Sequence, residues 1–293
     1  MDVLLTLDRA FLIGAAVTMR TISENADPSR QLRFHILHPD LTDEDIERLR
    51  SSVAPRLSAT SVTATRLDLA LFKGFLRSKS ISLTAYARLL AGDVLPSTIS
   101  RAVYVDVDVL FYPDISELFD LDLQGKAVAG VPNGSTEDQV ANAKRIGTDA
   151  SSYVATGLLI IDLDRWRNER LGERALSFAG SSKHLLTLHD QVALNWVLRG
   201  DFFALSEKWC HWSSHPPVAE ARVIHYAMSR KPWHADYRGG YREDFFAVLD
   251  RTSFAGWRPK NLLGLAPLIA SARRRIPYAP TVVRMVLKLF RRD

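Results

Sequence analysis

Cysteine is nearly missing from this chain, since Cys210 is the only one in 293 residues. A disulfide within one chain needs two cysteines, so no disulfide framework can form. A metal site built on cysteine ligands is excluded for the same reason. This composition fits a reducing compartment best.

Long apolar runs are also missing. The longest, at residues 262–272, is well short of the roughly 20 residues that span a bilayer. The N-terminus reads "MDVLLTLD", with carboxylates at Asp2 and Asp8 and no basic segment before an apolar run. We therefore expect neither a secretory signal nor a membrane-spanning helix.

A net positive charge is missing outside the C-terminus. The whole chain has a net charge of +5, but from Arg258 onward nine Lys or Arg face a single acid, Asp293. This segment carries a net charge of +8, which leaves the rest of the chain at −3. Because phosphate binding needs Lys and Arg clustered on one face, we do not expect the body of the protein to bind nucleic acid.

The chain does contain a regular alternation of β-rich runs and helical patterns. Strands are expected at residues 3–7, 32–37, 62–67, 102–106, 127–131, 157–163 and 222–227, and helices at 11–24, 43–53, 82–96, 165–178 and 190–198. Thr42 followed by Asp45 resembles a capping box at the second of these helices. This rhythm predicts an α/β domain whose central sheet is mostly parallel and covered by helices.

One of the expected strands leads into two acids. The segment 104–112 reads "YVDVDVLFY", and in an extended chain Asp106 and Asp108 would project from the same face. The pair follows a buried strand, at the sheet edge where ligands of α/β proteins usually bind. Desolvating two adjacent carboxylates is costly unless a cation or a proton compensates them. The pair therefore indicates a divalent cation with oxygen ligands, Mg²⁺ or Mn²⁺.

Two other interpretations of the pair stay open at this point. Most D-x-D sequences are exposed turns with no ligand. A Mg²⁺-dependent phosphohydrolase of the haloacid dehalogenase type would use Asp106 as nucleophile, although such motifs carry Thr or Val where this chain has Leu110. That mechanism also needs a downstream lysine and paired acids, and no convincing set is evident.

Several further motifs surround the acidic pair in a fixed order. They read "TLDRAF", "ISLTAYARLLAGDVLP", "AVYVDVDVLFY", "TGLLIIDLDRWR", "LHDQVALNW" and "VIHYAMSRKPWH". From about residue 1 to residue 246, this order resembles glycosyltransferase family 8, especially the bacterial lipooligosaccharide α-galactosyltransferases and related α-glucosyltransferases. The resemblance implies a GT-A fold that uses Mn²⁺ and a UDP-hexose and retains the anomeric configuration. It implies a catalytic domain at residues 1–250 and a basic C-terminal segment at 251–293.

The resemblance also implies roles for individual residues. The metal ligands would be Asp106, Asp108 and His225, and Lys231 would contact the donor diphosphate. Donor contacts would come from Asp8 and Phe11 at the uracil, Arg88 near the sugar and phosphates, and Asn133 and Thr156 near the sugar. Asp190 would bind sugar hydroxyls, and Gln191 would lie where a retaining glycosidase has its nucleophile, which favours front-face attack through a short-lived oxocarbenium ion pair.

The chain departs from the family pattern at a few positions around the donor. Arg9 and Ala10 replace polar residues, Ala155 replaces the asparagine of "FNAG", Asn133 replaces an aspartate, and Met228 replaces the glycine of "HxxG". The metal ligands are intact, so we expect an active enzyme with a shifted donor preference. The alternative is an inactive nucleotide-binding protein of the same fold.

The acceptor and the location are expectations of the same kind. The basic residues of "TVVRMVLKLFRRD" at 281–293, with the cluster Arg273–Arg275, suit a helix on an anionic membrane surface. The alternative is a helix packed on the protein itself or on a second subunit. We expect a cytoplasmic protein, peripheral on the inner face of a bacterial inner membrane, with a glycan or glycolipid acceptor selected in part by residues 209–221.

Overall fold

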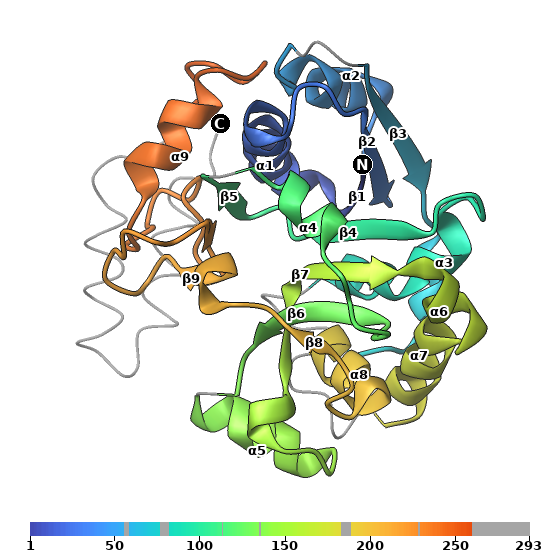
Figure 1. Ribbon diagram of the computed structural model, residues 1–293. Coiled ribbons are helices and arrows are strands. Elements are labelled where there is room, and N and C mark those ends of the chain that lie inside the picture. The colour runs from blue at the N-terminus through green and yellow to red at the C-terminus, as the bar shows by residue number, and fades with distance from the viewer. Residues whose placement is uncertain are drawn as a thin grey trace, which may run out of the picture.

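A computed structural model describes residues 1–55, 59–76, 82–112, 114–134, 136–182, 189–227 and 229–259. Within these residues a seven-stranded sheet runs in the order β3-β2-β1-β4-β7-β6-β8. Its strands are β1 (Asp2–Thr6), β2 (Leu32–His38), β3 (Thr60–Arg66), β4 (Arg101–Val105), β6 (Val128–Pro132), β7 (Val154–Asp162) and β8 (Phe203–Ala204). Helices cover both faces of the sheet, so the predicted α/β architecture is confirmed (Figure 1).

Six of these seven strands run in one direction, and β7 alone is reversed. The mostly parallel sheet was predicted, but the reversal of β7 was not. Because β7 is antiparallel to β4, its first residues lie beside the carboxyl end of β4, where the backbone N–H of Asp106 donates to the Gly157 carbonyl at 2.8 Å. The reversal therefore places the start of β7 next to the acidic pair.

The helices alternate with the strands much as the sequence predicts. The α-helices are α1 (Leu12–Asn25), α2 (Asp43–Ser52), α3 (Ala91–Val94), α4 (Ser116–Asp120), α5 (Glu137–Arg145), α6 (Leu163–Asn168), α7 (Leu171–Ser181), α8 (His189–Leu198) and α9 (Arg242–Leu249). The 3₁₀ segments are η1 (Arg9–Phe11), η2 (Leu69–Phe72), η3 (Leu83–Leu90), η4 (Ala150–Ser152) and η6 (Glu207–Trp209). The predicted capping box of α2 is confirmed, since the side chains of Thr42 and Asp45 each accept the other's backbone N–H.

Two helical predictions were wrong in detail. The segment expected as one helix at 82–96 is the 3₁₀ segment η3 followed by the short α3. The helix expected at 165–178 is divided into α6 and α7 at Arg170, whose φ of 52° is left-handed. Helices α4, α5 and α9 were not predicted. Neither the 3₁₀ winding nor the break leaves a mark in hydrophobic periodicity, because both arise from packing against other elements.

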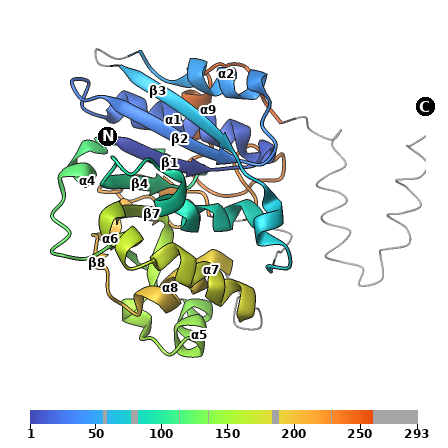
Figure 2. The same ribbon diagram turned by 90° about the vertical axis from the view of Figure 1, so that its right-hand side faces the viewer.

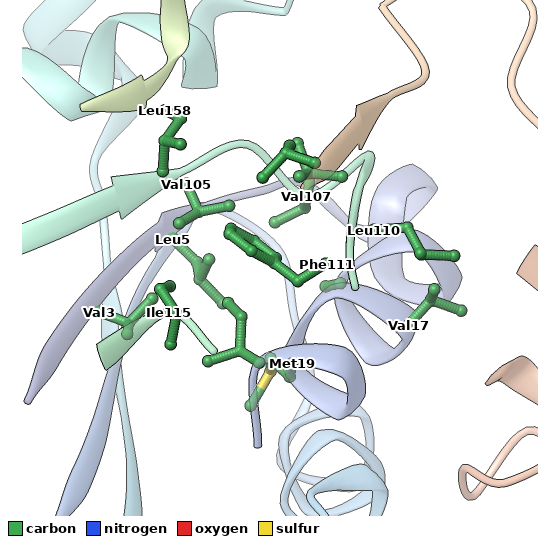
Figure 3. Packing of buried hydrophobic residues seen from close by; sticks show 14 of the residues in the cluster. Val3, Leu5, Val17, Met19, Val105, Val107, Leu110, Phe111, Ile115 and Leu158 are labelled. Atoms are coloured by element: carbon green, nitrogen blue, oxygen red, sulfur yellow. The ribbon is translucent and has the colours of Figure 1, made fainter. Parts of the chain in front are cut away.

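Two hydrophobic cores lie on the two faces of the sheet, and the alternation of side chains along β1 assigns residues to each. Val3 and Leu5 belong to the core beneath α1 and α9, and Leu4 belongs to the core beneath α6, α7 and α8. Figure 3 shows part of the first core, where side chains of β1, β4, β5 and α1 pack together. Figures 1 and 2 show the helices of the two cores on opposite sides of the sheet.

A second, three-stranded sheet lies beside the first and was not predicted. It consists of β5 (Val109–Phe111), β10 (Val223–His225) and β9 (His211–Trp212), in the order β5-β10-β9. β10 is antiparallel to β5 and pairs His225 with Val109. The backbone N–H of Tyr226 donates to the Asp108 carbonyl at 2.9 Å, so this pairing fixes His225 next to the acidic pair.

The C-terminal part of the described chain packs on α2. Phe254 is buried, and the Arg48 guanidinium lies 3.7 Å from its ring centroid. The predicted basic helix at residues 281–293 lies outside the described residues. Over the residues that are described, none of the helices combines the length and the apolar character that crossing a bilayer requires.

Candidate active site and metal centre

The two acids lie in a turn that joins β4 to β5. Asp106 directly follows β4, and Asp108 directly precedes β5. Their side chains converge because the chain turns between them. The sequence predicted this convergence from the alternation of side chains along a straight strand, which is not its cause. The exposed-turn interpretation is also wrong, since Asp108 is only 7% exposed and the Val107 side chain between them is buried.

Asp106, Asp108 and His225 can each offer one ligand atom to a common centre. The three atoms lie within 4.8 Å of one another. His225 Nε2 is 3.6 Å from Asp106 Oδ2 and 3.3 Å from Asp108 Oδ1. Two carboxylate oxygens and one imidazole nitrogen form a donor set that accepts a divalent cation such as Mn²⁺ or Mg²⁺, so the predicted ligands fit a metal.

The other oxygen of each carboxylate is held by the protein. Asp108 Oδ2 accepts a hydrogen bond from Lys231 Nζ at 2.5 Å. Asp106 Oδ1 accepts one from the Tyr104 hydroxyl at 2.7 Å and lies 3.0 Å from Arg88 Nη2. The side-chain contacts thus leave one oxygen of each acid facing His225.

The electrostatics of this cluster follow from burial and close charges. Burial alone would raise the pKa of Asp108, but the Lys231 ammonium and the His225 imidazole together hold that pKa well below its ordinary value. Burial opposes charge on His225, yet the adjacent Asp108 carboxylate raises the pKa of His225 to about 10. Burial raises the pKa of Tyr104 well above its usual range, so its hydroxyl stays protonated and can donate to Asp106.

The His225 ring is confined on two sides. Trp212 of β9 stacks on it, with ring centroids 5.6 Å apart and an interplanar angle of 16°. On β7, a Cβ added at Gly157 would lie 2.4 Å from His225 Cε1 and 3.1 Å from Asp106 Oδ2. The approach of the histidine to the acids therefore requires glycine at this position.

Arg88 connects the metal ligands to the predicted catalytic acid. Its guanidinium lies between Asp106 and Asp190, with Nε 2.9 Å from Asp190 Oδ2, and Nη1 donates to the Thr156 carbonyl at 2.7 Å. Arg88 is only 8% exposed, so the surface ion pair that an amphipathic helix would suggest is not formed. Burial raises the pKa of Asp190 to about 6, although Arg88 acts in the opposite direction.

The 3₁₀ winding of η3 explains how Arg88 reaches this position. Residues three apart share a face in such a helix. Ser82, which caps η3, and Ala85 and Arg88 within it all line the same cavity as the metal ligands. In an α-helix each step of three residues would turn the side chain by about 60°, so Ser82 and Arg88 would point in directions about 120° apart.

Gln191 and its neighbours form the end of the site at which the sugar is predicted. Thr156 Oγ1 lies 3.5 Å from Gln191 Oε1, and Gln191 Nε2 is buried without a hydrogen-bond partner among the residues that the structure describes. Asn133 is held in place, because its Oδ1 accepts from Gln139 Nε2 at 2.7 Å. Ala155 contributes no polar group where the resemblance implies an asparagine.

Asp8 and Phe11 line another part of the same cavity, where uracil is predicted to bind. Asp8 caps η1 by accepting the Ala10 backbone N–H at 3.1 Å, and Phe11 meets Trp233 edge to face at 5.8 Å. The substituted Arg9 pairs with Asp45 of α2 at 2.9 Å and does not line the cavity. Met228, which replaces the glycine of "HxxG", lies outside the described residues.

A single cavity of about 260 Å³ gathers every predicted site residue. These residues are Asp8, Phe11, Arg88, Asp106, Asp108, Asn133, Thr156, Asp190, Gln191, His225 and Lys231. The sequence interpretation missed Tyr104 and Gly157. Tyr104 could have been found because it precedes Asp106 by two on a strand, and Gly157 because glycine within a strand often marks a close approach.

A second cavity of about 620 Å³ adjoins the first. The two share Asn133, Ala155 and Trp212 in their lining. The second is otherwise lined mainly by residues 206–208, 210–212, 215 and 218–221, most of which lie in the segment expected to select the acceptor. The small side chain of Ala155 thus lies at the junction of two spaces.

Comparison with known proteins places the chain in a family. The family model described as Glycosyl transferase family 8 matches residues 2–237. General stress protein A of Bacillus subtilis is 24% identical over 250 residues, covering 78% of this chain and 86% of that protein. A lipopolysaccharide 1,2-glucosyltransferase of Escherichia coli is 23% identical over 293 residues, covering 94% of this chain and 80% of that protein.

The solved structures show the same fold. A crystal structure of the galactosyltransferase LgtC, in complex with donor and acceptor sugar analogues, matches with a TM-score of 0.74 at 22% identity. The match covers 90% of this chain and 99% of that one. The predicted GT-A fold with its mostly parallel sheet is confirmed. Because the family model spans every residue that lines the first cavity, this chain is a glycosyltransferase and belongs to glycosyl transferase family 8.

Proposed function

We propose that the protein transfers galactose or glucose from a UDP-sugar to a lipid-linked or lipopolysaccharide glycan, with retention of the anomeric configuration. The observation that carries this proposal is the composition of the first cavity. Asp106, Asp108 and His225 offer ligands for a cation, and Lys231 and Arg88 provide positive charge beside them. Such a combination suits a metal-bound diphosphate.

We assign Mn²⁺ to the cation site, with Mg²⁺ as the alternative. An imidazole among the ligands favours Mn²⁺ over Mg²⁺, because Mg²⁺ prefers oxygen ligands alone. When bound, the cation would supply Lewis acidity toward the departing diphosphate. Lys231 would then turn from Asp108 toward the diphosphate, where a compact ammonium neutralises charge on the leaving group.

The sugar would lie at the end of the cavity formed by Asp190, Gln191 and Thr156. The buried amide nitrogen of Gln191 has no partner in the described part of the chain and would donate to the sugar or the incoming hydroxyl. Asp190 would orient the ring through its hydroxyls while Arg88 fixes the carboxylate. An amide in place of a carboxylate nucleophile suits front-face attack.

The acceptor would occupy the second cavity, from which it could reach the donor sugar past Ala155. Trp212 lines both cavities and would contact a sugar ring there. The homologous lipopolysaccharide glucosyltransferase supports a glycan as the acceptor class. The basic segment at 251–293 would hold the protein on an anionic membrane that carries this glycan.

One assay tests the proposal. UDP release from UDP-galactose and from UDP-glucose is measured with an acceptor lipopolysaccharide, with and without Mn²⁺, for the wild type and for Asp108→Ala. We expect metal-dependent release that falls on the order of 10³-fold in the variant, since stabilisation of the leaving charge is lost. Phosphate release from phosphomonoesters without UDP turnover would instead support a phosphohydrolase. UDP binding with no turnover on either donor would support the inactive alternative.

A further inference from the structure

Tyr104 lies on the strand that leads to the predicted metal ligands, and the proposed function assigns it no role. It is fully buried on β4, two residues before Asp106. We propose that Tyr104 is a positioning residue that fixes Asp106 as a ligand with a single free oxygen. This inference rests on the proposed metal site and goes beyond it, because it concerns what holds the ligand.

The hydrogen bonds around Tyr104 have a fixed direction. The Tyr104 hydroxyl donates to Asp106 Oδ1 at 2.7 Å and lies 3.1 Å from Thr6 Oγ1 on β1. A phenol has one hydrogen, so the bond to Asp106 obliges Thr6 to donate to Tyr104. The chain Thr6 to Tyr104 to Asp106 therefore delivers a hydrogen-bond donor to one oxygen of the ligand.

The ring that carries this hydroxyl cannot easily move. Tyr104 pairs with Leu4 of β1 on one side and with Leu159 of β7 on the other. The Arg88 guanidinium lies over its ring, 4.5 Å from the centroid. Contacts at the centre of the sheet thus fix the position of the phenol ring. The ring in turn positions Asp106 in the loop that follows β4.

The contacts of Asp106 explain why this matters for a metal. Oδ1 meets both Tyr104 and Arg88, whereas Oδ2 is the oxygen nearer His225, at 3.6 Å. Without the phenol, Oδ1 would keep only its contact with Arg88 Nη2, and the carboxylate would be free to rotate about that single contact. That rotation would withdraw Oδ2 from the cation.

Asp108 provides a contrast within the same site. Its second oxygen is held by Lys231, a charged and flexible side chain that the proposed reaction sends to the diphosphate. Tyr104 is neutral and buried, so its contact with Asp106 can persist through the whole cycle. Asp106 is therefore held by a hydrogen bond that persists, and Asp108 by a contact that the proposed reaction breaks.

The experiment measures Mn²⁺ affinity directly, with the full chain and without substrate. Free Mn²⁺ is followed by electron paramagnetic resonance, and the intrinsic tryptophan fluorescence, to which Trp212 beside His225 contributes as one of six tryptophans, gives a second signal. We expect Tyr104→Phe to bind Mn²⁺ about tenfold more weakly, as for other residues that support a metal ligand. Saturating Mn²⁺ should restore most of the turnover, which a merely structural defect would not allow.

Two further variants keep the test decisive. Thr6→Val removes the supporting hydroxyl with little change in shape, and we expect a smaller loss of Mn²⁺ affinity, about threefold. It also tests the series of hydrogen bonds from Thr6 to Asp106 if Tyr104→Phe does not fold. Tyr237→Phe is the matched control, since Tyr237 is buried and its hydroxyl contacts Ser213 and the Gly240 carbonyl but no side chain of a predicted metal ligand. Its Mn²⁺ affinity should equal that of the wild type.

The outcomes separate this inference from the proposed function. If folded Tyr104→Phe and Thr6→Val both bind Mn²⁺ as the wild type does, the positioning role is wrong although the metal site stands. If the wild type binds no Mn²⁺, the proposed metal site itself is wrong. If Tyr237→Phe weakens binding as much as Tyr104→Phe, the loss reflects general destabilisation and overturns the inference.

Discussion

The two ends of the cavity differ in how completely the protein satisfies its own polar groups. At the metal end, one oxygen of Asp106 and one of Asp108 are held by protein donors, and the others face His225. At the sugar end, Gln191 Nε2 has no partner among the described residues, and Ala155 has no polar side chain to offer. The side chains at the metal end are therefore held in place before a ligand binds. At the sugar end, a bound ligand would supply the missing hydrogen-bond partner.

This difference matches where the sequence departs from the family pattern. The predicted metal ligands match the pattern, whereas Ala155 and Asn133 differ from it and line both cavities. A preorganised ligand set tolerates little change, because each atom supports another. A site completed by its ligand can change its preference through one side chain. If the two ends differ in this way, substitutions at the metal end should have larger effects than substitutions at the sugar end.

Gly157→Ala should damage the metal end most severely. The added methyl group would lie 2.4 Å from His225 Cε1, a distance that requires the histidine to move away from the acids. We expect Mn²⁺ affinity to fall about 10²-fold, at the upper end for disturbed ligand support. Calorimetric titration of Mn²⁺ gives the value.

Gly180→Ala is the control for this variant. It lies in α7, and its added methyl group would meet only the ring edge of Phe75, at 3.3 Å. Its Mn²⁺ affinity should not change. Equal affinities for Gly157→Ala and the wild type would contradict the tight packing that we infer at the metal end.

Gln191→Ala should damage the sugar end alone. A hydrogen bond to a charged group contributes about 1.5–3 kcal/mol. Turnover should therefore fall about 10- to 100-fold if Gln191 supports the charged sugar intermediate. The affinity for UDP with Mn²⁺ should stay within about twofold, because the metal end is untouched. Steady-state kinetics and UDP titration test the pair of expectations, and unchanged turnover would remove Gln191 from the catalytic residues.

Ala155→Asn should change the donor preference. An added amide can contribute one neutral hydrogen bond to the donor, about 1 kcal/mol, and so alter the ratio of rates with UDP-galactose and UDP-glucose about fivefold. Ala155→Leu adds similar bulk without the amide and separates hydrogen bonding from size. If both variants shift the ratio equally, bulk at the junction of the cavities decides the preference. An unchanged ratio in both would show that this position does not read the sugar.

Asp2→Asn should leave both ends of the cavity unchanged and lower stability. Asp2 of β1 contacts His35 at 2.8 Å and Arg33 at 2.5 Å, both on β2. Although burial alone would raise the pKa of Asp2, these partners lower it to about 2. The ionised carboxylate therefore stabilises the fold above pH 4, and this contribution is lost as the pH falls from 4 through 2.

The expected cost of Asp2→Asn at pH 7 is about 2 kcal/mol in the free energy of unfolding. Urea denaturation at pH 7 and at pH 3 should show the difference from the wild type shrinking at the lower pH. Turnover under native conditions should not change. A difference that persists undiminished below pH 3 would mean that the charge of Asp2 is not the cause.

Much of this architecture could be predicted from local sequence patterns. The strands from β1 to β4, the helices α1 and α2 and the capping box of α2 have periodicities or end signals that depend on neighbouring residues alone. The short strands β9 and β10 lie far along the chain from β5, and nothing local reveals their pairing. Arg170 and η3 differ from prediction for the same reason, because packing against distant elements decided their backbone conformation.

The sequence by itself determined the chemistry of the site: Asp106 and Asp108 after a buried strand, with His225 and Lys231 in a motif much later in the chain. The tertiary structure decided how those groups are used. It reversed β7 so that Gly157 leaves room for His225, and it directed the Tyr104 hydroxyl to one oxygen of Asp106. The physical reason is that the sequence specifies which residue types are present and in which order. The direction of a hydrogen bond and the space for a ring depend on segments that meet only in the folded protein.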